Sequence, residues 1–294
     1  MDAAPDASIE PRPRLQSLPE RGGGMAYLDF GPLDRPVDLV FSHANGFNAR
    51  TYRMLLAPLA ATLRIFAIDL RGHGASTMPA DADRHGGWHM FRDDLLAFLD
   101  AVADGPVALA GHSMGGTSSL LAAAQRPERV SALGLIDPVI FDAAIGSQGT
   151  GDSPLVQGAR RRRAAFPSKA AAYEAYLGRG AFKTWRPEQL ADYVEAGLRE
   201  TGTGEFTLSC APEWEAANFS THNYDPFAAL KNSRCTIRIL KAEEGSTARL
   251  EDHERELIAT RRITIETLPG TTHFLPMERP DRVRELLEAT ATAR

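Results

Sequence analysis

Short apolar runs alternate with amphipathic segments along most of the chain. The apolar runs contain β-branched and other apolar residues without strict alternation between apolar and polar positions. This pattern is typical of strands that helices cover on both faces. Segments with apolar residues at helical spacing separate them, and this succession predicts βαβ units around a mostly parallel sheet. The predicted strands are Val37–His43, Leu63–Asp69, Val107–Gly111, Ala132–Asp137, Thr236–Ala242 and Ile263–Leu268, with Met25–Phe30 as an antiparallel edge strand.

Two of the amphipathic segments are clear helix candidates. Within Trp88–Val102, the apolar residues Phe91, Leu95 and Leu99 form one stripe, and acidic residues lie outside it. The second candidate is the closing segment that begins at Pro280, since proline is favoured in the first turn of a helix. Both fit helices that pack on a sheet.

The alternation stops between residues 141 and 230. Strand patterns vanish there, and helical patterns such as Pro187–Glu200 dominate. The segment holds 12 of the chain's 22 aromatic residues, which favours an apolar lid over a solvated loop. We therefore expect it to form a helical cap on a core made of residues 21–140 and 231–294. The run Arg160–Arg163 within it is expected to be a solvated helix face.

Composition narrows the classes of protein. The chain has 294 residues, with 33 Lys and Arg against 38 Asp and Glu, and a net charge of −5. This balance argues against nucleic-acid binding, which depends on cations that neutralise phosphates. No run approaches the ~20 apolar residues of a membrane span.

The N-terminus and the cysteines bear on the cellular location of the protein. Residues 1–20 are rich in proline and charge, lack the apolar stretch of a secretory signal and are expected to form a flexible tail. Cys210 and Cys235 are two scattered thiols, which indicates a reducing compartment without a disulfide framework. We expect a cytoplasmic protein.

The strongest chemical signal is Gly111-His-Ser113-Met-Gly115, placed between an apolar strand and an apolar helix. A sharp strand-to-helix turn strains the backbone of the serine, and only residues without a Cβ fit close beside it. The positive end of the following helix helps to stabilise negative charge near Ser113. In this context the motif predicts a nucleophile.

With three further segments in matching order, the chain resembles the α/β-hydrolase superfamily. His43-Ala-Asn-Gly-Phe47 lies where the family carries a His-Gly-X loop, Asp69–Ser76 is similar to its Asp-x-Arg-Gly-x-Gly-x-Ser turn, and Gly270-Thr-Thr-His273 resembles its catalytic-histidine loop. The resemblance covers nearly all of the chain after the tail. It implies the α/β-hydrolase fold, an α/β architecture with a mostly parallel eight-stranded sheet flanked by helices and an inserted cap. Dehalogenases and epoxide hydrolases of this fold use an aspartate nucleophile, so Ser113 argues against both.

The resemblance also implies a catalytic triad. His273 is the expected base, because a serine hydroxyl is a weak nucleophile that needs one. Most relatives place an aspartate after the penultimate strand, where this chain has Glu243, Glu244, a glycine and a serine. Part of the superfamily instead carries the acid after the strand that follows the nucleophile helix. That strand ends here in Asp137, which we predict to orient His273, with Glu243 and Glu244 as alternatives.

An oxyanion hole needs two N–H donors aimed at the developing negative charge. One is expected from Met114, directly after the nucleophile, and the match to the His-Gly-X loop gives Asn45 as the other. Ala44 replaces the usual glycine of that loop, so Gly46 and Phe47 remain alternatives. The Asn45 side chain is either an additional donor or a contact that shapes the loop.

The sequence gives weaker indications of the substrate and of any cofactor than of the catalytic residues. Phe47 and Trp214 are candidates for substrate binding, with core packing as the alternative for both. The histidines show no metal-ligand spacing and no phosphate-binding glycine loop occurs, so we expect neither a metal nor a cofactor. The residues together predict a serine carboxylesterase that cleaves an apolar small-molecule ester through an acyl-enzyme on Ser113. Acyl transfer and carbon–carbon bond hydrolysis would use the same triad, and a ligand-binding protein without turnover is a further alternative.

Overall fold

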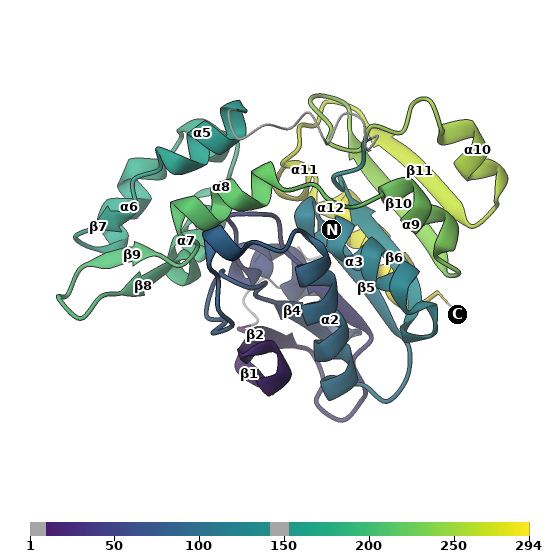
Figure 1. Ribbon diagram of the computed structural model, residues 1–294, viewed down its shortest axis with the longest axis horizontal. Helices are drawn as coiled ribbons and strands as arrows, with labels where there is room; N and C mark the ends of the chain where they lie inside the picture. Colours follow the sequence, from purple (N-terminus) through teal and green to yellow (C-terminus); the bar gives the residue numbers. More distant parts are fainter. Residues whose placement is uncertain (1–9, 142–152, 294) are drawn as a thin grey trace, which may run out of the picture.

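One eight-stranded sheet forms the centre of the molecule (Figure 1). The computed structural model describes residues 10–141 and 153–293. The strand order is β1-β2-β4-β3-β5-β6-β10-β11, and every pairing from β4 to β11 is parallel. The prediction of a mostly parallel, eight-stranded sheet is therefore confirmed. The strands are β1 (Arg12–Leu18), β2 (Gly23–Phe30), β3 (Leu39–Ser42), β4 (Ile65–Ile68), β5 (Val107–His112), β6 (Val130–Ile136), β10 (Thr236–Ala242) and β11 (Ile263–Leu268).

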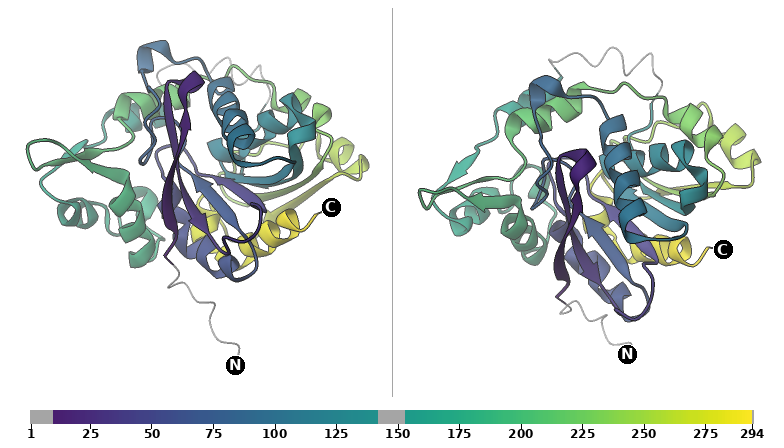
Figure 2. Two further views of the ribbon diagram at one scale, coloured as in Figure 1. Left: turned by 90° about the horizontal axis from the view of Figure 1, so that it is seen from below. Right: turned by 60° about the horizontal axis from the view of Figure 1, so that its bottom comes forward.

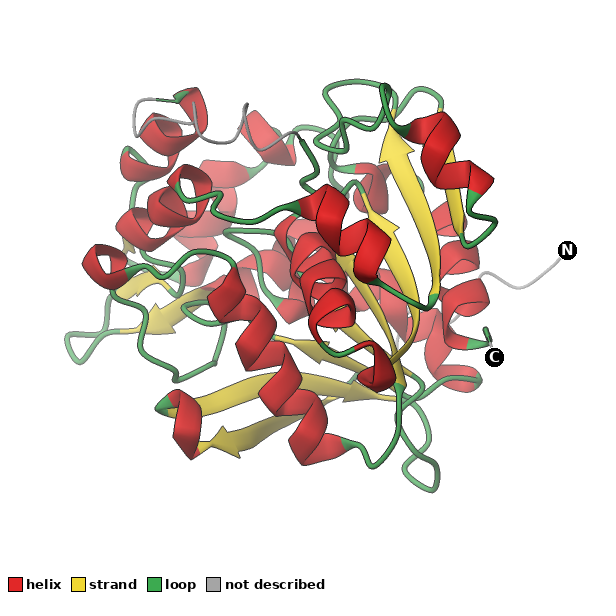
Figure 3. Cartoon of the chain, turned by 45° about the vertical axis from the view of Figure 1, so that its right-hand side comes forward, coloured by secondary structure: helices red, strands yellow, loops and turns green. Residues whose placement is uncertain are grey.

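Helices cover both faces of this sheet (Figure 3). Val40 and Phe41 are successive residues of β3 and belong to two different apolar clusters, one on each face. The Val40 cluster includes α2, α3 and α9, and the Phe41 cluster includes α1 and α12. The helices of the core are α1 (Arg53–Leu56), α2 (His89–Val102), α3 (Met114–Gln125), α9 (Pro226–Asn232), α10 (Glu254–Ala259), α11 (Leu275–Glu278) and α12 (Pro280–Ala291).

Short 3₁₀ helices occupy several connections between these elements. They are η1 (Pro19–Arg21), η2 (Ala49–Tyr52), η3 (Ala57–Ala61), η4 (Ala82–Arg84), η5 (Pro127–Arg129) and η6 (Gly180–Phe182). In the parts of the chain that the structure describes, no helix is both long and apolar enough to cross a bilayer.

Residues 153–220, which we call the insertion, form a separate group of elements beside the sheet (Figure 1). Its strands pair antiparallel in the order β7-β9-β8, whereas the sequence pattern indicated helices alone. Its helix α7 packs against η2 and α1 of the core, and α9, which follows the insertion, packs against α3. Residues 142–152 of the predicted cap lie outside the described residues. The elements are α5 (Pro154–Arg160), β7 (Ala165–Phe166), α6 (Lys169–Tyr176), α7 (Pro187–Gly197), β8 (Leu198–Glu200), β9 (Phe206–Leu208) and α8 (Pro212–Ser220).

The prediction of a flexible tail over residues 1–20 is wrong for the segment Arg12–Leu18. This segment is β1, and it pairs along its whole length with β2 as the true edge strand (Figure 2). It was missed because most of its side chains are polar and lie at the surface, so it lacks an apolar pattern. Residues 1–9 of the predicted tail lie outside the described residues.

Candidate active site

Ser113 lies in the turn between β5 and α3, at the carboxyl end of a central strand. Its backbone has φ 54° and ψ −120°, a strained conformation of the kind that costs about 1–3 kcal/mol. A Cβ on Gly115 would lie 2.2 Å from the carbonyl oxygen of Ser42, and one on Gly111 would lie 2.4 Å from the carbonyl carbon of Gly115. Only glycine fits at these two positions, as the motif predicts.

Asp137 follows β6, the strand beside β5. The Ser113 N–H donates to the carbonyl oxygen of Ile136 over 2.9 Å, and the Asp137 N–H donates to that of Leu240 over 2.7 Å. Bonds between adjoining strands thus fix both residues. Ser113 and Asp137 therefore lie at the carboxyl ends of neighbouring strands.

His273 lies in the loop between β11 and α11 and contacts Asp137 directly. Its Nδ1 donates to Oδ2 of Asp137 over 2.6 Å. Because Nδ1 then carries the proton of a neutral imidazole, Nε2 is left as the acceptor. The His273 side chain is 25% exposed, whereas that of Asp137 is fully buried. The structure therefore joins two of the predicted catalytic residues.

Further donors from β10 and the loop after it surround the Asp137 carboxylate. The Ala242 N–H lies 3.0 Å and the Ser246 hydroxyl 2.5 Å from Oδ1, and the Thr247 N–H lies 3.1 Å from Oδ2. Burial alone would raise the pKa of Asp137, but the contacts with His273, Ser246 and Ala242 outweigh it and hold the pKa below its ordinary value. The carboxylate is thus kept ionised.

The alternative acids Glu243 and Glu244 are both exposed. The Glu243 carboxylate accepts from the Gly270 N–H over 2.9 Å, and the Glu244 N–H donates to the carbonyl oxygen of Thr271. Among the described residues, the acid in contact with His273 is Asp137. Ser246 and Thr247 were not predicted as partners of Asp137, although they occupy the loop after β10 where most relatives carry the acid.

The backbone N–H groups of the loop after β3 differ in whether they have a hydrogen-bond acceptor. The Ala44 N–H donates to the Tyr52 hydroxyl over 3.2 Å, the Gly46 N–H to Nε2 of His73 over 3.0 Å, and the Phe47 N–H to the carbonyl oxygen of Ala44 over 3.1 Å. Within residues 10–141 and 153–293, the Asn45 N–H has no protein acceptor. The alternatives Gly46 and Phe47 therefore have their N–H groups engaged.

The Asn45 side chain bonds to the insertion. Its Nδ2 donates to the carbonyl oxygen of Glu215 over 3.0 Å, and its Oδ1 accepts from Nδ2 of Asn218 over 2.8 Å. Both partners belong to α8. Of the two roles considered for this side chain, the contacts are those of a group that shapes the loop.

Two buried histidines support the same loop as neutral rings. His43 donates through Nδ1 to the carbonyl oxygen of Ala44 and accepts at Nε2 from the Leu70 N–H, at 2.7 and 2.9 Å. His73 donates through Nδ1 to the carbonyl oxygen of Arg71 over 2.9 Å. Burial lowers the pKa of His73 to about 4 and that of His43 well below its ordinary value. Their roles are structural.

The two predicted substrate-binding residues lie in different surroundings. The Phe47 ring is 5.2 Å from that of Trp185 and 6.3 Å from that of Phe274, next to His273 in the chain. Trp214 instead donates its indole N–H to the carbonyl oxygen of Arg71 over 3.0 Å and is buried against Gly72. The position of Trp214 is that of a scaffold residue.

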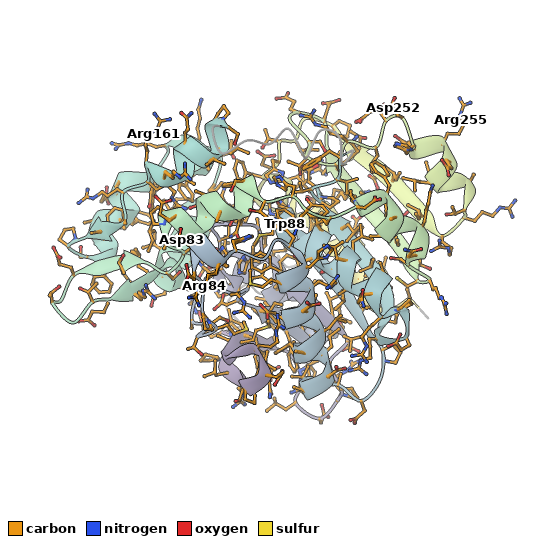
Figure 4. The ribbon with its side chains drawn as sticks, viewed as in Figure 1. Asp83, Arg84, Trp88, Arg161, Asp252 and Arg255 are labelled. Carbon is orange, nitrogen blue, oxygen red and sulfur yellow. The ribbon has the colours of Figure 1, made fainter. Side chains whose placement is uncertain are left out.

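The arginine run of the insertion is not uniformly solvated. Arg161 points away from the molecule (Figure 4), as expected of a solvated face. Arg162 instead pairs with Glu215 and donates to the Tyr193 hydroxyl over 2.5 Å. The described residues contain no group of three or more His, Cys, Asp or Glu arranged to hold a metal ion.

Comparison with known proteins identifies the family to which this chain belongs. The sequence model of the alpha/beta hydrolase family matches residues 39–286, and the chain belongs to this family. It is 35% identical to human monoglyceride lipase over 118 residues, which is 37% of this chain and 38% of the lipase. It is 38% identical over 110 residues to the dihydrolipoyllysine-residue acetyltransferase component of the acetoin cleaving system of Pseudomonas putida, covering 37% of this chain and 29% of that protein. The matches thus span about a third of these relatives.

Solved structures extend the likeness of fold to most of the chain. The structure of E-2-(acetamidomethylene)succinate hydrolase has a TM-score of 0.79 at 19% identity and covers 95% of this chain and 98% of its own. The thioesterase domain from the curacin biosynthetic pathway has a TM-score of 0.75 at 18% identity and covers 95% of this chain and 100% of its own. At these identities the likeness concerns the fold alone.

Proposed function

We propose that the protein is a serine hydrolase that cleaves carboxylic esters through an acyl-enzyme on Ser113. The observation that carries the proposal is the 2.6 Å hydrogen bond between His273 and Asp137, at the end of the strand beside the strained turn of Ser113. A buried, ionised carboxylate that orients an imidazole beside a serine is the arrangement of a hydrolytic triad.

The reaction proceeds in two halves. The Ser113 hydroxyl attacks the ester carbonyl carbon while Nε2 of His273 takes its proton, and Asp137 stabilises the resulting imidazolium. His273 then gives this proton to the departing alkoxide, which leaves as an alcohol. In the second half, water attacks the carbonyl carbon of the acyl-Ser113 ester while Nε2 of His273 takes its proton. His273 then returns the proton to the Ser113 oxygen as the bond between this oxygen and the acyl carbon breaks, and the carboxylic acid is released.

The N–H groups of Asn45 and Met114 form the oxyanion hole in this proposal. In the described parts of the chain, neither donates to a protein acceptor. Met114 is the first residue of α3, where backbone N–H groups have no partner within the helix and carry partial positive charge. Two such donors stabilise the negative oxygen of the tetrahedral intermediate.

An apolar ester is the proposed substrate. Aromatic rings from the core and the insertion gather beside the base, since the Phe274 ring lies 5.8 Å from that of His273 and 6.2 Å from that of Trp185. Phe47 completes this group and lies in the loop that carries Asn45. Such surroundings favour an apolar acyl or alcohol group over a charged one.

The proposed nucleophile is tested by treating the purified protein with a fluorophosphonate probe and locating the adduct by peptide mass spectrometry. A single adduct on Ser113, absent from Ser113→Ala, is the expected result. A panel of p-nitrophenyl esters of increasing chain length then measures the acyl preference, and added alcohols reveal any acyl transfer. An unlabelled Ser113 in folded protein would overturn the proposal and favour a ligand-binding protein.

A further inference from the structure

His112, the residue directly before Ser113, is fully buried and uses both of its ring nitrogens. Nδ1 lies 2.7 Å from the Tyr52 hydroxyl, and Nε2 lies 2.8 Å from the carbonyl oxygen of His273. The rings of His112 and His273 are 4.8 Å apart. His112 therefore contacts the backbone of the proposed base, although no proposed step uses it as an acid or a base.

The chemistry of the two partners fixes the direction of these bonds. A carbonyl oxygen can only accept, so Nε2 of His112 must carry a proton and donate to His273. Burial lowers the pKa of His112 to about 3, which keeps the ring neutral. A neutral ring with its proton on Nε2 accepts at Nδ1, and the Tyr52 hydroxyl must therefore be the donor.

The chain of hydrogen bonds continues from Tyr52 to the loop after β3. Because its proton points to His112, the Tyr52 oxygen accepts from the Ala44 N–H over 3.2 Å. Ala44 immediately precedes Asn45, so this bond fixes the backbone next to the proposed oxyanion donor. A chain of hydrogen bonds, each with a fixed donor and acceptor, thus runs from the Ala44 N–H through Tyr52 and His112 to the carbonyl oxygen of His273.

We propose that Tyr52 and His112 are positioning residues that set the distance between the oxyanion hole and the catalytic base. This inference rests on the proposed function. His112 is attached by the backbone to Ser113, by Nε2 to the loop of His273, and through Tyr52 to the loop of Asn45. Its contacts link three groups that must meet around one carbonyl carbon, and small misplacements of such groups cost rate.

Tyr52→Phe tests this role, because it removes only the hydroxyl between Ala44 and His112. With p-nitrophenyl butyrate as the probe ester, we expect kcat to fall by about 10- to 100-fold while KM changes little. Tyr224→Phe is the matched control, since it removes a buried hydroxyl that donates to the carbonyl oxygen of Val139 outside this chain of bonds. Its kcat should stay close to that of the wild type.

A second measurement requires no variant. In wild-type protein, ¹⁵N NMR of the assigned His112 ring should find a neutral imidazole with its proton on Nε2 from about pH 8 to pH 5. A proton on Nδ1, or a charged ring in this range, would overturn the directed chain even if Tyr52→Phe fails to fold.

The outcomes separate the two proposals. If wild-type Ser113 reacts with the fluorophosphonate probe but Tyr52→Phe and Tyr224→Phe have equal kcat, the positioning role is wrong and the proposed function stands. If wild-type Ser113 does not react, the proposed function fails and the positioning role of Tyr52 and His112 fails with it.

Discussion

Nδ1 of His273 and Oδ2 of Asp137 are 2.6 Å apart, although the two residues are separated by 136 positions in the chain. The contact exists because β6 and β11 both flank β10 and run parallel to it. The residues that follow β6 and β11 therefore meet at the carboxyl ends of these strands. This relationship makes the identity of the acid directly testable.

Asp137→Asn should lower kcat for p-nitrophenyl butyrate by about 10⁴-fold, because the amide no longer stabilises the imidazolium and favours the wrong tautomer. Glu243→Gln and Glu244→Gln serve as controls and should keep activity near the wild-type value. Steady-state kinetics on folded protein, checked by circular dichroism, measures the effect. Loss of activity in a glutamate variant with an active Asp137→Asn would reverse the assignment.

Ser246→Ala should move the acidic limb of the kcat/KM profile to higher pH. Loss of the hydroxyl at 2.5 Å raises the pKa of Asp137, and a more basic carboxylate binds the protonated form of His273 more strongly. Ser233→Ala is the control, since its buried hydroxyl donates to the carbonyl oxygen of Ala229 in α9, away from Asp137. Identical profiles for the two variants would contradict the role given to Ser246.

Gly115→Ala should destabilise the protein by more than about 2 kcal/mol, because the new Cβ would lie 2.2 Å from the Ser42 carbonyl oxygen. Gly158→Ala is the opposite case, since no described atom beyond its chain neighbours and its own helix lies within 4 Å of a Cβ there, and alanine favours the helix α5. Urea unfolding measures both. A Gly115→Ala variant as stable as the wild type would refute the tight packing of the turn.

The free energy of unfolding should fall as pH drops from about 7.5 to 5. Burial lowers the pKa of His73 to about 4, so the unfolded chain binds the proton first as pH falls below about 6.5. The contribution of neutral His73 to the free energy of unfolding is fully present above that pH. About 2 kcal/mol of this contribution is lost by pH 5. Burial also raises the pKa of Asp69 to about 6. As pH falls, Asp69 in the folded protein therefore takes up a proton before Asp69 in the unfolded chain does, and this opposes the loss of stability.

His73→Gln isolates the histidine contribution. The glutamine oxygen can still accept from the Gly46 N–H but does not titrate. Urea titrations at several pH values should therefore give this variant a smaller loss of stability on acidification than the wild type. An unchanged pH dependence would mean that His73 carries its proton in the folded protein.

Local motifs were sufficient to predict Ser113 and His273 as candidates, since each lies in a short segment next to a recognisable strand. The choice between Asp137 and the two glutamates stayed open because it depends on which strand ends are neighbours, and the order β5-β6-β10-β11 is a tertiary property. The partners of Asp137 and of His112 come from distant segments for the same reason.

The elements that the sequence did not predict have little apolar pattern. β1 is a polar edge strand, and the strands β7, β8 and β9 are two or three residues long. Arg162 was expected to be solvated because its neighbours are arginines, but its partner Glu215 lies 53 positions further along the chain. Burial decided by such distant contacts has no local signal.

The bonds from α8 to Asn45 have a consequence for how this protein can change. The Asn45 side chain is held by Glu215 and Asn218, which lie 170 and 173 positions away in helix α8 of the insertion. A recombination that exchanged the insertion alone would remove both partners of Asn45 together. Under the proposed function, a graft that changes the substrate preference through the insertion must therefore also supply new hydrogen-bond partners for Asn45, or the oxyanion loop loses two of its supports.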